Sequence, residues 1–327
     1  MALDVLTIGD PTIDTSIRIH DAHVALQVHP ERAELHIDYA DKIPVDEMYR
    51  STGGNCVNAA RAARRLGLDV AVYGVTGDDL DGRWIRQELA HARVDTSLMA
   101  VDRKRSTNAS IALIFRGERT LFVWHQPRHY HLPVLPETAW IYATSVGPLG
   151  PAISDLHSAL LRALRHQPAA RLAFSPGTHQ LRMGAKAIAP MLCATELLLL
   201  NREEAEELTC RPKAEPRELL QRLHALGPRK VVMTDGIRGS YGYDGERYLR
   251  TGVLKMPVVD RTGAGDSYGA TVMTALHLGL DLGTAMAWGT AQAAFVVSAL
   301  GAAPGLVDRR RLQAVVGEHP GLVAKAF

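Results

Sequence analysis

The stretch "ELLLLNREEAEEL", residues 196–208, shows in one place how this chain is built. Four consecutive leucines form a strand that is apolar on both faces, and Asn201 ends it. A helix follows at once, beginning with Glu203 and Glu204. Strands that bury both faces are typical of parallel sheets covered by helices. The stretch therefore predicts one strand–helix unit of an α/β fold.

The same alternation of apolar strands and helical segments extends along most of the chain. Strands are expected at residues 5–8, 70–73, 140–143, 171–174, 196–200 and 230–234. A hairpin at 240–250 follows them, with Asp244-Gly245 as its turn. These segments predict a doubly wound, mostly parallel sheet with helices on both faces, in a single domain over residues 1–327.

Weaker strand patterns come from two separate regions, about 12–50 and 105–128. Residues 109–115 and 120–124 read as a hairpin around "RGER". None of these segments has enough apolar bulk to form a core alone. We expect them to pair into a small β-lid that closes over the carboxyl ends of the main strands, where open α/β sheets bind ligands.

The composition excludes several classes of protein. The chain is 46% hydrophobic and 22% charged, and its net charge of +2 gives no reason to expect nucleic acid or a membrane as the main partner. The apolar run at 285–300 contains Gln292 and is short for a membrane span, so a buried helix is expected. Three widely spaced cysteines, without a C-x-x-C pair, and an acidic Asp4 where a signal peptide is basic predict a cytoplasmic location.

The segment "VVDRTGAGDSYGA", residues 258–270, predicts an anion site beside a base. Gly263, Ala264 and Gly265 expose backbone amides, and a helix from about Asp266 adds unpaired N–H groups and the positive end of its dipole. Asp266 is the expected base for phosphoryl transfer. The plainer alternative is a carboxylate that stabilises the helix N-terminus, and the dipole is expected to lower the pKa of Asp266.

Two further strand ends carry polar groups suited to a nucleotide. Asn201 and Glu204 are expected to serve Mg²⁺ through water, with ordinary helix capping as the alternative. In "VVMTDGIRGS", Thr234, Gly236 and Gly239 are expected to contact phosphate or ribose, with a plain turn as the alternative. Gln292 is placed with this nucleotide-binding group.

The amino-terminal half offers groups suited to a hydroxyl-rich acceptor. Asp10 and Asp14 flank the end of the first strand, and "STGGNCVNAA" places Gly53 and Gly54 before a helix that carries Asn58. Carboxylates and amides bond hydroxyl groups in both directions. These side chains are expected to form the acceptor site.

These motifs together resemble the PfkB/ribokinase family of carbohydrate kinases. "DRTGAGDSY" is similar to its C-terminal signature, "GGNCVNAA" to its glycine motif and "NREE" to its magnesium-associated motif, in the family's order. The resemblance implies a ribokinase-like fold with a β-lid, ATP as phosphoryl donor and Mg²⁺ as cofactor. It also implies that Asp266 is the base, that 263–265 form the anion hole, and that Asp14, Gly54 and Asn58 bind the acceptor.

The acceptor stays open between a sugar, a sugar acid and a nucleoside, since Asn55 stands where ribokinases proper have lysine. Many relatives use a monovalent cation such as K⁺ near the segment of Asp260 and "GAAPG", and a homodimer through the lid edges is a further expectation. A regulator that binds without turnover is a remote alternative. The chain lacks a P-loop, "GAGDSYG" has the wrong spacing for a dinucleotide site, and the histidines of "HQPRHYH" are expected in a loop.

Overall fold

A computed structural model describes residues 2–19, 24–28, 33–115, 118–148 and 150–327. Within these residues a nine-stranded sheet forms the centre of the molecule. Its strands lie in the order β6 (Val70–Tyr73), β1 (Leu3–Ile8), β11 (Thr138–Ala143), β12 (Arg171–Phe174), β13 (Thr195–Asn201), β14 (Lys230–Thr234), β15 (Ser240–Tyr243), β16 (Tyr248–Thr251) and β17 (Lys325–Ala326). The strands from β6 to β14 are parallel, and the last three pair antiparallel. The predicted doubly wound sheet is therefore confirmed, including the hairpin at its end.

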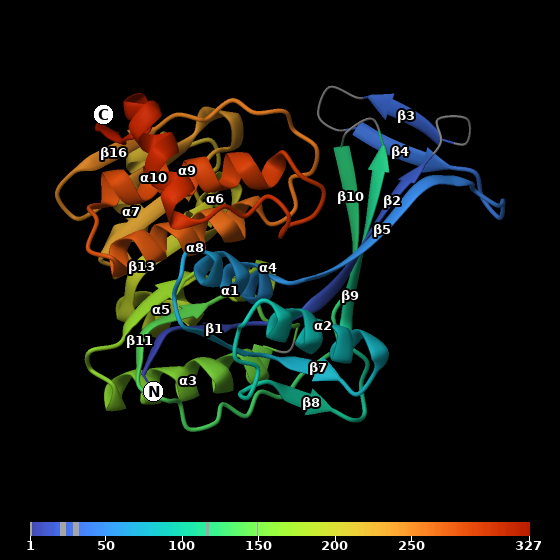
Figure 1. The fold of residues 1–327 in the computed structure, drawn as a ribbon, viewed down its shortest axis with the longest axis horizontal. Coiled ribbons are helices and arrows are strands. Elements are labelled where there is room, and N and C mark those ends of the chain that lie inside the picture. The colour runs from blue at the N-terminus through green and yellow to red at the C-terminus, as the bar shows by residue number, and fades with distance from the viewer. Residues whose placement is uncertain (1, 20–23, 29–32, 116–117, 149) are drawn as a thin grey trace.

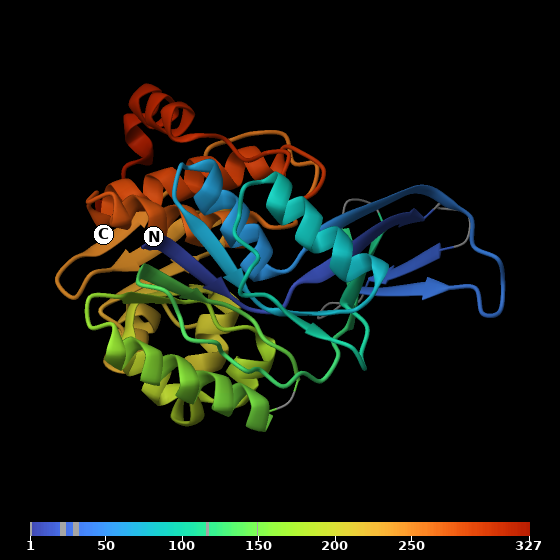
Figure 2. The ribbon, with the colours of Figure 1, turned by 60° about the horizontal axis from the view of Figure 1, so that its bottom comes forward.

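Helices cover both faces of this sheet (Figures 1 and 2). One layer consists of α1 (Asn55–Arg65), α2 (Leu80–His91), α8 (Ala264–His277), α9 (Leu282–Val297) and α10 (Arg309–Glu318). The other consists of α3 (Gly150–His166), α4 (Thr178–Arg182), α5 (Ala185–Ala194), α6 (Arg202–Thr209) and α7 (Pro216–Ala225). Strand β1 shows why both layers are needed, because Val5 packs into the first apolar core while Leu6 and Ile8 pack into the second.

A separate small sheet, which we call the lid sheet, extends from the helical body (Figure 1). In the described chain it has four strands, in the order β10 (Glu118–Trp124), β9 (Asn108–Phe115), β2 (Thr12–Ile19) and β5 (Val45–Gly53). Two shorter pairs form separate two-stranded sheets. These are β3 (Val24–Val28) with β4 (Ala33–Ile37), and β7 (Val75–Gly77) with β8 (Ala100–Asp102). The lid sheet thus draws its strands from two regions that are distant in the sequence. The expected turn at residues 116–117 lies outside the described residues.

Several element boundaries differ from the sequence-based expectations. Strand β2 begins at Thr12 rather than residue 15, because Thr12 and Ile13 already pair with β9 and β5. Asp14 therefore lies within a strand of the lid sheet. Helix α2 begins at Leu80 rather than Arg83, since the side chain of Asp79 accepts a hydrogen bond from Gly82 N at 2.7 Å and caps the helix there.

The apolar run near the C-terminus folds as expected into a buried helix. Helix α9 packs beside α8, and most of its residues are buried. None of the helices in the described residues combines the length and apolar character needed to cross a membrane.

Candidate active site

Helix α8 begins beside the carboxyl ends of the central strands, and its first turn carries Asp266. Gly263 precedes the helix with φ of 73°, a left-handed conformation that favours glycine. A Cβ built on Gly263 would lie 2.3 Å from the Cβ of Ala302, so a larger residue would collide with residues 301–305. Gly265 is exposed, and a Cβ there would meet open space. The N-terminus of α8 therefore borders an open region at Gly265, where an anion is expected to bind.

Asp266 is fixed by a partner from the opposite end of the sequence. The Nδ2 atom of Asn58, on α1, donates a hydrogen bond to Asp266 Oδ2 at 2.8 Å. The other amide atom of Asn58, Oδ1, is buried and has no partner within the described residues. An unsatisfied buried acceptor of this kind is suited to a ligand hydroxyl. The structure thus joins the predicted base and a predicted acceptor ligand.

The pKa of Asp266 is raised to about 6. Burial is the largest cause, the negative charge of Asp14 adds to it, and the hydrogen bond from Asn58 acts in the opposite direction. The expectation that the helix dipole would lower this pKa is wrong, because desolvation outweighs it. A carboxylate with a pKa near 6 is ionised at neutral pH and still able to accept a proton.

Asp14 faces the same region from strand β2 of the lid sheet. Its Oδ1 accepts hydrogen bonds from Ser110 Oγ at 2.6 Å and from Thr12 Oγ1 at 3.1 Å. A Cβ on Gly53 would lie 2.0 Å from Asp14 Oδ2, so the glycine allows this carboxylate to reach its position. Burial raises the pKa of Asp14. Asp14, Asn58 and Asp266 therefore form one polar group, as the sequence predicted.

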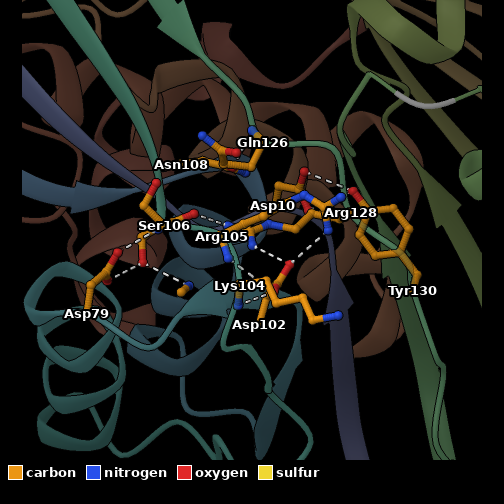
Figure 3. A network of polar contacts seen from close by, with 12 residues as sticks. Asp10, Asp79, Asp102, Lys104, Arg105, Ser106, Asn108, Gln126, Arg128 and Tyr130 are labelled. Carbon is orange, nitrogen blue, oxygen red and sulfur yellow. Dashed lines mark hydrogen bonds and ion pairs between the residues drawn. The ribbon is translucent and has the colours of Figure 1, made fainter.

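The carboxylate of Asp10 lies deeper, in the network of Figure 3. Tyr130 donates its hydroxyl to Asp10, with oxygen–oxygen distances of 3.0 and 2.9 Å, and accepts a hydrogen bond from Gly147 N. The buried Arg128 pairs with Asp102 at 3.1 Å. Burial raises the pKa of Asp10 to about 6. Gly54 belongs to the same wall, since a Cβ there would lie 2.3 Å from Asp10 O.

A cavity of about 960 Å³ adjoins the N-terminus of α8. Asn201, Thr234, Gly236, Asp260 and Arg119 are among the residues that line it. Its size suits a nucleotide, and its walls are the loops that follow β13 and β14. Gly239 does not line this cavity, because it packs against Thr251 O. Gln292 is fully buried in α9 and also lies outside the lining.

Asn201 and Glu204 form a capping box at the start of α6. Asn201 Oδ1 accepts from Glu204 N, and Glu204 Oε2 accepts from Asn201 N, both at 2.8 Å. Capping, the plainer alternative, therefore occurs. The pKa of Glu204 is nevertheless raised to about 7 by burial, and the charge of Asp266 adds to the increase. A cation near both carboxylates would offset this repulsion.

The donor set suits Mg²⁺, which proteins often hold with one or two carboxylates together with substrate phosphates. Within the described residues there is no group of three or more His, Cys, Asp or Glu side chains that could hold a metal alone. His125, His129 and His131 lie in an irregular segment, as expected.

Arg119 is a site residue that the sequence reasoning missed. It lies on β10 of the lid sheet, and its Nη1 donates a hydrogen bond to Thr262 Oγ1 at 2.7 Å, next to the anion hole. Its positive charge opposes the increase that burial causes in the pKa values of Asp14 and Asp266. Only the strand register shows that Arg119 shares the site-facing side of the lid with Asp14. Arg119 is the last residue of "RGER", in a hairpin whose register the sequence does not specify.

Asp260 forms hydrogen bonds that the sequence did not predict. Its carboxylate accepts hydrogen bonds from Thr262 N at 2.9 Å, from Thr262 Oγ1 at 2.7 Å and from Gly301 N at 2.9 Å. It thereby joins the segment before the anion hole to residues 301–305. The expected monovalent cation near Asp260 stays a prediction.

Comparisons with known proteins agree with this geometry. A family model described as "pfkB family carbohydrate kinase" matches residues 25–309. The 5-dehydro-2-deoxygluconokinase of Shouchella clausii is 28% identical over 283 residues, which cover 82% of this chain and 86% of the relative. The nucleoside kinase of Methanothermobacter thermautotrophicus is 25% identical, with 81% and 84% covered.

A solved structure described as Arabidopsis thaliana ribokinase complexed with ribose and ATP has the same fold. Its TM-score is 0.79 at 17% identity, with 97% of this chain and 99% of that chain covered. Because the family model spans most of the sequence, and three motifs in order predicted the match, the chain belongs to the pfkB family of carbohydrate kinases.

Proposed function

We propose that the protein is an ATP-dependent kinase that phosphorylates a primary hydroxyl of a sugar or sugar acid. The observation that carries the proposal is the position of Asp266 at the N-terminus of α8. Asn58 donates a hydrogen bond to it, and the charges of Asp14 and Arg119 act on its pKa. The names of several relatives, 5-dehydro-2-deoxygluconokinases, support a sugar-acid acceptor.

In this proposal Asp266 orients the acceptor hydroxyl and takes its proton. The hydroxyl oxygen forms a bond to the γ-phosphorus while the bond to the ADP oxygen breaks in line. Backbone amides of residues 263–265 and the guanidinium of Arg119 stabilise the charge on the transferring group. Magnesium, when bound through Glu204 and the phosphates, supplies charge neutralisation. Asp14, Gly53, Gly54 and Asn58 bind the acceptor.

The nucleotide is assigned to the cavity lined by Asn201, Thr234 and Gly236. We assign Gly239 and Gln292 no direct contact with the nucleotide, because neither lines the cavity. A monovalent cation beside Asp260 remains part of the proposal. We also propose a reducing compartment, the cytoplasm, which the three free cysteines support.

A homodimer through the lid sheet completes the proposal. Strand β10 is an edge strand, and Leu121, Phe122, Val123 and Trp124 are each between 49% and 57% exposed. Exposed apolar edge strands are sites of association.

The test is ADP release from MgATP across pentoses, hexoses, sugar acids and nucleosides. We expect turnover with a sugar or sugar acid, and a fall in kcat of at least ~10²-fold for Asp266→Asn with little change in ATP affinity. Turnover confined to nucleosides would keep the mechanism and replace the substrate. ATP binding without any turnover would favour a regulator, and an unchanged kcat in Asp266→Asn would reject the base.

A further inference from the structure

A second cavity, of about 860 Å³, lies apart from the nucleotide cavity. It is bounded by β5, by the C-terminal halves of α1 and α2, and by residues 302–306. Five arginines line it: Arg50, Arg61, Arg64, Arg65 and Arg93. Its one acidic lining residue is Glu88. We call it the arginine cavity.

The positive charge of this cavity is only partly neutralised. Arg50 pairs with Asp81 at 2.9 Å and Arg64 with Asp69 at 3.0 Å. In the described part of the chain, neither Arg65 nor Arg93 has a carboxylate partner. An excess of guanidinium groups in one concave site attracts anions.

Arg61 is more deeply buried than the paired arginines Arg50 and Arg64. Its side chain is only 9% exposed, and it donates hydrogen bonds to Thr52 O at 2.9 Å and to Thr52 Oγ1 at 2.6 Å. Glu88 Oε2 lies 3.8 Å away, which is an ion-pair distance but too long for a hydrogen bond. Burial also lowers the pKa of Arg61. This ion pair lacks a hydrogen bond, so it offsets only part of the cost of burying the guanidinium.

Basic residues also occur at helix C-termini because they offset the helix dipole. That explanation applies to Arg64 and Arg65, which lie in the last turn of α1. It does not apply to Arg61, which lies a turn earlier, or to Arg50, which comes from β5 of the lid sheet. The helix dipole therefore does not explain why these two arginines converge in one cavity.

We propose that the arginine cavity binds a small phosphate-bearing anion and that its occupancy acts on the catalytic cleft. Guanidinium groups match phosphate oxygens in pairs, and a cavity of this size is in the usual range for small ligands. Lysine ammonium groups also attract anions, but they lack the planar pair of donors that a guanidinium group offers to phosphate. This anion is distinct from the nucleotide phosphates, which we assign to the other cavity.

Two walls of the arginine cavity continue into the catalytic cleft. Thr52, which holds Arg61, is followed by Gly53, which lies against the carboxylate of Asp14. Arg65 donates to Leu306 O at 3.3 Å, and in the same loop Ala302 packs against Gly263 at the anion hole. An anion that moves Arg61 or Arg65 therefore moves a wall of the active site.

Inorganic pyrophosphate is a suitable probe, used in isothermal titration calorimetry at fixed free Mg²⁺. Arg61→Gln is the direct variant, but loss of a buried partner endangers folding. Arg93→Asn and Arg65→Gln change exposed side chains, and asparagine tolerates the φ of 59° at Arg93. Arg165→Gln on α3 removes the same charge elsewhere and serves as control. Arg119→Gln reports binding in the catalytic cleft instead.

We expect Arg93→Asn and Arg65→Gln to weaken pyrophosphate binding at least about tenfold, because each loses a charge-assisted hydrogen bond. Arg165→Gln and Arg119→Gln should keep the wild-type affinity for this site. No binding by the wild type, or equal affinity in all four variants, would overturn the site. This result does not depend on the proposed kinase activity.

The coupling is tested with the acceptor that the ADP-release panel identifies. At saturating MgATP, pyrophosphate should change the acceptor KM by several-fold in the wild type and in Arg165→Gln, but not in Arg93→Asn. An acceptor KM that stays constant while pyrophosphate binds would refute the action on the cleft.

Discussion

Asp266 owes its chemistry to where the chain buries it. Next to a helix N-terminus an exposed aspartate would have a lowered pKa. Here burial and the charge of Asp14 raise the pKa to about 6. The residue therefore remains ionised at neutral pH while it is a stronger base than an exposed carboxylate.

The first prediction concerns the dependence of activity on pH. With saturating MgATP, kcat/KM for the acceptor should fall about tenfold per pH unit below pH 6, because protonated Asp266 cannot accept a proton. The measurement is a pH–rate profile between pH 4.5 and 8, in which ~ tenfold steps mark a single ionisation.

Asp10 has a pKa of about 6 as well, so Asp10→Asn is the control. If the break near pH 6 belongs to Asp266, it persists in Asp10→Asn. A break that disappears in that variant assigns the ionisation to Asp10 instead.

The second prediction concerns Gly263. Gly263→Ala should lower kcat by about 10²-fold, because a Cβ at φ 73° collides with Ala302 and displaces the anion hole. Gly279→Ala is matched to it, with φ of 83° and nothing within 4 Å of the added Cβ. Both variants should lose about 1–2 kcal/mol of stability from backbone strain, measured by thermal unfolding. An equal loss of kcat in both would mean that strain alone is responsible.

At the scale of elements, the lid sheet brings charge as well as cover to the site. Arg119 bonds Thr262 beside the anion hole, and Tyr49 of β5 lies close enough that a Cβ on Gly301 would be 3.2 Å from its ring. These two contacts hold the lid against the body next to the segment that precedes Asp266.

The third prediction follows from that contact. Arg119→Gln should lower kcat/KM about tenfold and move the acidic break in the pH profile to higher pH, since the positive charge that lowers the pKa of Asp266 is lost. Thr120→Ala, whose side chain points to the other face of β10, should leave both unchanged. A lower rate without a shifted break would mean that Arg119 acts only as a structural contact.

The sequence predicted the main elements well and the lid less well. Apolar runs such as Leu197–Leu200 specify buried parallel strands, because alternatives expose too much apolar surface. The strands of the lid sheet, of 7–9 residues, are partly exposed and carry weaker apolar patterns, so their register depends on partners that are distant in the chain. That register decides which side of the lid Asp14 and Arg119 share, and for this reason Arg119 was missed.

The same reasoning applies to the site. Gly263 and Asp266 lie three residues apart in one motif, so the sequence alone indicated that they share the start of a helix. The bond from Asn58 to Asp266, and the raised pKa values of Asp10 and Glu204, depend on burial that only the tertiary structure creates. Gln292 was placed with the nucleotide by pattern, yet α9 buries it away from the cavity.

At the scale of the molecule, the exposed apolar surface of β10 predicts association. Analytical ultracentrifugation should show a dimer at micromolar concentration, and Phe122→Glu should shift it towards monomer because a charge on an apolar interface is costly. Val134→Glu is the control, since Val134 is 96% exposed and lies outside the lid. A wild type that sediments as a monomer would reject the lid dimer.

The hydrogen bond between Asn58 and Asp266 joins residues that are 208 positions apart. During synthesis, at ~5–20 residues per second, Asn58 therefore leaves the ribosome roughly 10–40 s before its partner. Asn58 is therefore synthesised well before Asp266, its hydrogen-bond partner. A nascent chain that stops before α8 lacks Asp266 and also the helices α8 and α9, which cover one face of the sheet, so this bond can form only when synthesis is nearly complete.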